Sequence, residues 1–82
     1  MAYWVYILYS EKFDRYYIGQ TYDLDARLSR HNSGYVDSTK SYIPWEIKLA
    51  MSKETRSESM LLEKKLKNLN RKRLLEFIEK YK

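Results

Sequence analysis

Cysteine is absent from the 82-residue chain, and histidine occurs only once. Without cysteine there can be neither a disulfide framework nor a thiolate metal site, and one imidazole cannot build a metal cage from histidines. Any bound metal must therefore rely on oxygen ligands, which favours Mg²⁺, Mn²⁺ or Ca²⁺.

Long apolar runs are absent as well. No segment approaches the roughly 18 consecutive apolar residues that a membrane span needs, and the first residues do not pair a charged leader with an apolar stretch. We therefore expect a cytoplasmic protein with no membrane partner. Residues 1–82 suffice for one small domain, which buries about 60–65% of the surface of its unfolded chain.

The motifs of several common enzyme classes are also missing. The chain has no glycine-rich phosphate loop, no zinc-ligand spacing, no paired catalytic aspartates and no Ser-His-Asp order. These absences exclude the corresponding reaction classes.

Basic residues are present in excess, with 16 Lys and Arg against 11 Asp and Glu, which gives a net charge of +5. This balance favours polyanionic partners. Six of the basic residues fall within ten positions: Lys64, Lys65, Lys67, Arg71, Lys72 and Arg73. Such a run is either a solvated helix face or a surface that contacts phosphates, and the sequence leaves both open.

Two strands are predicted at the start of the chain. Residues 3–9 are almost all aromatic or β-branched, which indicates a strand covered on both faces. A short polar connection at residues 10–14 leads directly into a second strand at residues 15–20, so we expect the two strands to form a β-hairpin.

A helix is predicted next. Thr21 or Asp23 can cap its first turn, and Gly34 suits the left-handed residue that closes it. At about 100° per residue, Leu24 and Leu28 form the buried stripe of this helix.

The second half of the chain predicts a loop at residues 35–44, a strand at residues 45–51 and two helices. Period-two alternation in the strand is typical of one buried face, formed by Trp45, Ile47, Leu49 and Met51. A capping box at residues 55–58 opens the next helix, and Asn70 can cap the last one. The apolar faces of these helices are Leu62, Leu66 and Leu69, then Leu74, Leu75, Ile78 and Tyr81.

The predicted element order is thus β-β-α-β-α-α. We expect an α+β fold in which helices flank a three-stranded, mainly antiparallel sheet.

Four polar side chains are expected to meet on this framework. Hairpin pairing can bring Tyr6 and Tyr17 together on one sheet face, near Arg27 and His31 of the first helix. A tyrosine with a pKa near 10 is a poor base unless cations lower that pKa, and Arg27 could do so. The alternative is that each tyrosine only packs in a half-buried position.

Arg27 and His31 also have two interpretations. His31 is the one side chain expected to exchange protons near neutral pH, although a histidine at a helix end often only caps or packs. An arginine facing the sheet without a carboxylate partner suggests an anionic ligand, whereas Asp23 offers it a routine surface ion pair.

Glu58 and Glu63 compete for the role of acidic metal ligand. Glu58 already has a structural role in the capping box. Glu63 has no structural role in the capping box, although it could form an ordinary helix-surface ion pair with Lys67, four residues further on.

The chain resembles the GIY-YIG nuclease family, most closely its small single-domain bacterial branch. The resemblance covers nearly the whole chain and rests on Val5-Tyr6-Ile7, Tyr17-Ile18-Gly19, Arg27, His31 and the acidic helix at residues 57–63. Only the tyrosine of the family's first motif is fully matched.

The resemblance implies a metal-dependent endonuclease that hydrolyses phosphodiester bonds of DNA or RNA. Tyr6 would then be the general base or its helper, Tyr17 would orient the attacking water, and Arg27 would neutralise the phosphate. His31 would accept or relay a proton, and Glu63 would bind Mg²⁺ or Mn²⁺. This division of labour matches what phosphoryl transfer requires.

Targeting is expected to be weak, because the chain has no room for the separate target-binding domain that characterised family members carry. Affinity would then come from the basic run, and a protein partner could supply targeting. A nucleic-acid-binding or adaptor module with little or no catalysis is therefore the alternative function, and a tyrosine-rich scaffold is a third.

Overall fold

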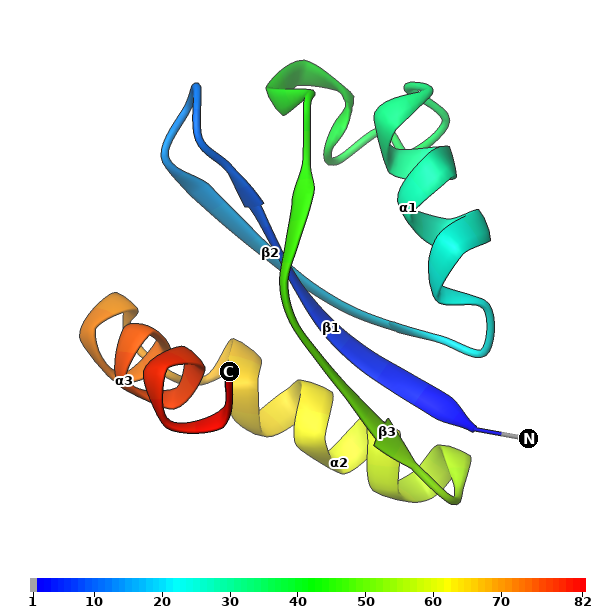
Figure 1. Cartoon of the computed structure of the whole chain (residues 1–82), viewed down its shortest axis with the longest axis vertical. Helices are drawn as coiled ribbons and strands as arrows, with labels where there is room; N and C mark the ends of the chain where they lie inside the picture. Colours follow the sequence, from blue (N-terminus) through cyan, green and yellow to red (C-terminus); the bar gives the residue numbers. More distant parts are fainter. Residues whose placement is uncertain (1) are drawn as a thin grey trace.

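The first strand, β1 (Tyr3–Ser10), forms the centre of a three-stranded sheet because its side chains are apolar on both faces. The computed structural model describes residues 2–82 (Figure 1). The remaining elements are β2 (Arg15–Thr21), α1 (Leu24–Asn32), the short 3₁₀ helix η1 (Lys40–Tyr42), β3 (Glu46–Lys53), α2 (Arg56–Lys67) and α3 (Arg71–Tyr81). The strands are ordered β2-β1-β3 and both pairs are antiparallel, which confirms the predicted α+β fold.

The two faces of the sheet carry different helices (Figure 1). Val5 and Ile7 of β1 belong to the core under α2 and α3, together with Leu66 and Ile78. Tyr6 and Leu8 of β1 belong to a second cluster, together with Leu24 and Leu28 of α1. Alternation along one central strand therefore divides a small protein into an aliphatic core and a separate tyrosine-containing layer.

The prediction of one buried face for β3 is wrong. The pairing with β1 shifts between Ile7, opposite Leu49, and Leu8, opposite Ile47, so Lys48 is an extra residue in a β-bulge. Leu49 and Met51 consequently pack in the aliphatic core, whereas Trp45 and Ile47 pack in the layer beside α1. The alternation predicted the strand correctly, but the bulge moves half of it to the opposite face.

The helix boundaries follow their capping residues. Asp23 Oδ1 accepts a hydrogen bond from the Ala26 amide at the start of α1, and Gly34 adopts a φ of +80° after its end. Thr55 and Asn70 cap α2 and α3 in the same way.

The apolar face predicted for α3 is only partly correct. Leu74 and Ile78 are buried, whereas Leu75 and Tyr81 remain 38% and 46% exposed. Among residues 2–82, no helix combines the length and apolar character needed to cross a membrane.

Candidate active site

Tyr6 packs against the backbone of β2 at a glycine. Its cross-strand partner is Gly19, and a Cβ atom at that position would lie 2.6 Å from Cζ of Tyr6. Only glycine leaves room for the phenol to lie across the neighbouring strand. The tyrosine is 1% exposed, and its hydroxyl is directed toward α1.

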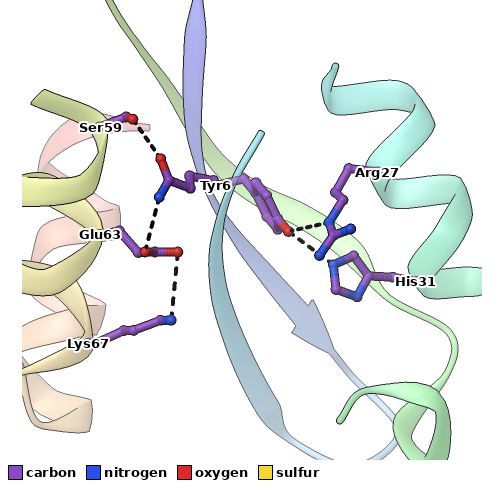
Figure 2. A network of polar contacts seen from close by, with 7 residues as sticks. Tyr6, Arg27, His31, Ser59, Glu63 and Lys67 are labelled. Carbon is purple, nitrogen blue, oxygen red and sulfur yellow. Dashed lines mark hydrogen bonds and ion pairs between the residues drawn. The ribbon is translucent and has the colours of Figure 1, made fainter. Parts of the chain in front are cut away.

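A directed chain of hydrogen bonds runs through the Tyr6 hydroxyl (Figure 2). Arg27 Nε donates to the Tyr6 oxygen over 3.5 Å, and the same oxygen lies 3.0 Å from His31 Nε2. His31 Nδ1 is 2.8 Å from Thr39 Oγ1, which itself donates to the Val36 carbonyl. When Thr39 donates its one proton to that carbonyl, Nδ1 carries the histidine proton and Nε2 accepts the proton of Tyr6; this is the tautomer we adopt.

Burial sets the protonation states of this chain. Desolvation raises the pKa of Tyr6 above its usual 10, although the hydrogen bond from Arg27 opposes the shift. Desolvation also lowers the pKa of His31 below 6.5, and the positive charges of Arg27 and Arg30 act in the same direction. Both residues are therefore neutral near pH 7. The expected lowering of a tyrosine pKa by Arg27 is outweighed by burial.

Tyr17 completes the group on this face of the sheet. Its ring lies 6.4 Å from that of Tyr6 and 4.9 Å, edge to face, from the imidazole of His31. Arg27 makes no ion pair within the described chain, because Asp23 is engaged as the cap of α1. The structure thus brings four of the five predicted site residues together and leaves the guanidinium without a carboxylate.

Glu63 lies across the sheet from this group, on α2 (Figure 2). Its carboxylate accepts from Gln20 Nε2 over 3.5 Å and lies 3.6 Å from Lys67 Nζ, the ion pair expected from their spacing. The side chain is 21% exposed, and its charge contributes to the raised pKa of Tyr6. Glu58, the competing candidate, is engaged with Thr55 in the capping box.

A cleft of about 760 Å³ connects the two halves at the end of the sheet. It is lined by Tyr3, Gln20, Thr21, Tyr22, Arg27 and Arg56. Arg27 belongs to the tyrosine group and Gln20 to the Glu63 group, so a ligand in this cleft could contact one residue of each group, although Tyr6, His31 and Glu63 do not line it. Two guanidinium groups and no carboxylate line it, which suits an anion.

Oxygen donors around Glu63 fit a magnesium ion that keeps most of its water. Within residues 2–82 no three His, Cys, Asp or Glu side chains lie close enough to form an all-protein cage. Mg²⁺ commonly binds through one or two carboxylates and substrate phosphates, and Glu63 is a partly exposed carboxylate in contact with Gln20 of the arginine-lined cleft. Glu63 would hold the ion, with Lys67 displaced from the carboxylate.

The six predicted phosphate contacts are all exposed, at the end of α2 and the start of α3. Two have intramolecular partners: Lys67 pairs with Glu63, and Arg71 pairs with Asp14 in the hairpin turn. In the described part of the chain, Lys64, Lys65, Lys72 and Arg73 make no ion pair.

Three polar residues of this region were not predicted from the sequence. Thr39 fixes the orientation of His31, while Gln20 and the fully buried Ser59 support Glu63. Thr39 lies in an irregular loop, and Ser59 resembles any small polar residue on a helix, so neither carries a local pattern. Only Gln20 could have been found from the sequence, because it directly follows the Tyr17-Ile18-Gly19 motif.

Comparison with known proteins adds independent findings. A family model, the GIY-YIG catalytic domain, matches residues 2–81. Among solved structures, the chain is similar to the UPF0213 protein BH0048 from Bacillus halodurans, determined by solution NMR, with 28% sequence identity and a TM-score of 0.63. That similarity covers 96% of this chain and 84% of the other. Comparison with curated proteins gives no significant match.

Proposed function

Since the chain belongs to the GIY-YIG family, we propose that it is a Mg²⁺-dependent endonuclease that hydrolyses phosphodiester bonds of DNA or RNA. The match to the catalytic domain makes it a nuclease-type module with a nucleic acid as substrate. One observation carries the finer proposal: the hydrogen-bond chain from Arg27 through Tyr6 to His31 ends in a neutral imidazole nitrogen that can take a proton.

The proposed first step is the binding of the scissile phosphate in the cleft beside Arg27. The contact from Arg27 to the Tyr6 oxygen is long, 3.5 Å, so a phosphate can compete for the guanidinium at little cost. When the guanidinium turns to the phosphate, a lone pair of the Tyr6 oxygen becomes free to accept a hydrogen bond from water. Tyr17, half-buried beside the same ring, would help to orient that water.

Proton transfer then follows the direction of the hydrogen bonds. The attacking water gives its proton to the Tyr6 oxygen while Tyr6 gives its own proton to His31 Nε2, so no free phenolate is required. The water oxygen forms the new bond to phosphorus, and the leaving oxygen departs and takes a proton from solvent. The negative phosphate near Arg27 offsets the charge that develops on His31.

Metal chemistry is assigned to Glu63. A cation held there would neutralise charge on the phosphate and on the leaving oxygen. The guanidinium of Arg27 lines the cleft and Glu63 adjoins the cleft residue Gln20, so the guanidinium and a cation held by Glu63 would act on one phosphate.

The test is a cleavage assay on linear, nicked and branched DNA and on RNA, with Mg²⁺ or Mn²⁺. Glu63→Gln is compared with Glu58→Gln, a matched change on the same helix that preserves a capping-box side chain. We expect metal-dependent cleavage that only Glu63→Gln abolishes. Cleavage that survives Glu63→Gln would refute the metal assignment, and salt-sensitive binding without cleavage by the wild type would assign the adaptor function instead.

A further inference from the structure

Gln20 links the β2 edge of the sheet to α2 through both ends of its amide. Its register partner is Val5, so its side chain leaves the sheet on the α2 face. There Oε1 accepts from Ser59 Oγ at 2.7 Å, and Nε2 donates to Glu63 Oε1 at 3.5 Å. The two amide ends therefore meet a hydroxyl that can either donate or accept and a carboxylate that can only accept.

The hydroxyl of Ser59 is shared between two acceptors. Its oxygen lies 2.7 Å from Gln20 Oε1 and also 2.7 Å from the carbonyl oxygen of Arg56. A serine has one proton, so it can donate a full hydrogen bond to only one of these oxygens. The serine side chain is fully buried, and water cannot easily supply the missing donor.

A 180° turn of the Gln20 amide would remove this conflict. Nε2 would donate to Ser59 Oγ, and the serine proton would go entirely to the carbonyl of Arg56. The turn would also point Oε1 at the Glu63 carboxylate, and two facing oxygens repel each other unless a cation lies between them. The orientation of the amide is thus coupled to whether a cation lies between Gln20 and Oε1 of Glu63, because Lys67 pairs with the other carboxylate oxygen, Oε2.

We propose that Gln20 is a second protein ligand of the cation held by Glu63, with its amide oxygen made available by this turn and Ser59 as the positioning residue. The inference rests on the proposed function, because it concerns the same metal ion. The two atoms at issue are 3.5 Å apart, within the roughly 4 Å that two Mg–O bonds of 2.0–2.1 Å can span. An amide oxygen is an accepted ligand for hard cations.

The experiment uses the side-chain amide of Gln20, which is the only glutamine in the chain. Selective ¹⁵N labelling of glutamine gives one pair of amide protons, whose nuclear Overhauser contacts are followed during a Mg²⁺ titration. We expect contacts to the Glu63 methylenes to be lost and contacts to the Ser59 methylene to strengthen. In parallel, Mn²⁺ affinity measured by electron paramagnetic resonance should fall at least about tenfold in Gln20→Leu.

Two further variants separate ligation from structure. Gln20→Glu supplies a carboxylate oxygen at the same position, so it should restore or tighten Mn²⁺ binding. Ser59→Ala keeps the ligand oxygen and should weaken binding less than Gln20→Leu.

The outcomes distinguish this inference from the proposed function. Metal-dependent shifts at Glu63 with an unmoved Gln20 amide, or wild-type Mn²⁺ affinity in Gln20→Leu, would overturn the inference alone. The absence of any metal-dependent change at Glu63 would overturn both the inference and the proposed metal dependence.

Discussion

Replacing Gly19 with alanine is expected to disable the site by displacing Tyr6 from its position beside His31. The new Cβ atom would lie 2.6 Å from Cζ of Tyr6, whereas carbon atoms in ordinary contact are about 3.5 Å apart. The phenol would have to move by about 0.9 Å, the difference between these values. Its 3.0 Å hydrogen bond to His31 Nε2 cannot survive a movement of that size.

The expected cost has two parts. Overpacking costs about 1–3 kcal/mol, and leaving the buried tyrosine–histidine pair unsatisfied costs about 1–3 kcal/mol more. Alanine also lowers the conformational entropy of the unfolded chain, which stabilises the folded state by about 0.4–1 kcal/mol. The net loss in the free energy of unfolding should be about 1–6 kcal/mol. The turnover of the molecules that remain folded should fall by about 10²-fold, because the proton acceptor is misplaced by nearly 1 Å.

Gly34→Ala provides a matched control. Gly34 has a φ of +80°, so alanine there is strained by about 1–2 kcal/mol, but its Cβ meets nothing closer than 3.9 Å and lies outside the site. Urea unfolding gives the stability of each variant, and cleavage per folded molecule gives its activity. A Gly19→Ala variant that is no less stable than Gly34→Ala and cleaves at the wild-type rate would show that Tyr6 does not depend on the space above Gly19.

Three other predictions concern the same region. Because the pKa of His31 in the folded protein lies below its usual 6.5, the folded state binds fewer protons than the unfolded chain. The contribution of the neutral His31 to the free energy of unfolding should therefore be fully present above pH 6.5 and decrease as the pH falls. His31→Gln should flatten this pH dependence in urea unfolding between about pH 5 and 7. Thr39→Val should lower the free energy of unfolding by about 1–3 kcal/mol and reduce cleavage, because it leaves His31 Nδ1 without a hydrogen-bond partner. Thr39→Ser should restore both, and an inert Thr39→Val would contradict a role for the Thr39–His31 hydrogen bond. Replacing Lys64 and Lys65 with alanine should weaken nucleic-acid binding for all sequences and reduce the slope of log affinity against log salt by about 1 per lysine, whereas an unchanged slope would exclude them from the binding surface.

The fold was largely predictable because its elements have strong local signals. Residues 3–9 are apolar on both faces, and such a strand has to be central. Gly34 marks the end of α1, and of the two predicted capping residues, Thr21 and Asp23, the structure uses Asp23. The β3 bulge was not predictable, since regular alternation continues through Lys48 and only pairing with β1 shows that the register shifts.

The candidate site was only partly predictable, because some of its contacts join segments that are distant in the sequence. Periodicity placed Tyr6, Tyr17, Arg27 and His31 on facing surfaces, and the structure brings them together. The supporting contacts depend on atoms that meet only after folding. The acceptor of the His31 proton comes from an irregular loop, and burial, which outweighs Arg27 in setting the Tyr6 pKa, cannot be read from neighbouring residues.

The most direct test of the proposed mechanism is the single-turnover cleavage rate of Tyr6→Phe, measured with Mg²⁺ and saturating protein on a substrate that the wild type cleaves. Phenylalanine keeps the ring packed over Gly19 but removes the hydroxyl that links water to His31. The mechanism predicts a rate reduced by about 10²–10⁴-fold, with nucleic-acid affinity nearly unchanged. A Tyr6→Phe variant that cleaves at the wild-type rate would contradict it.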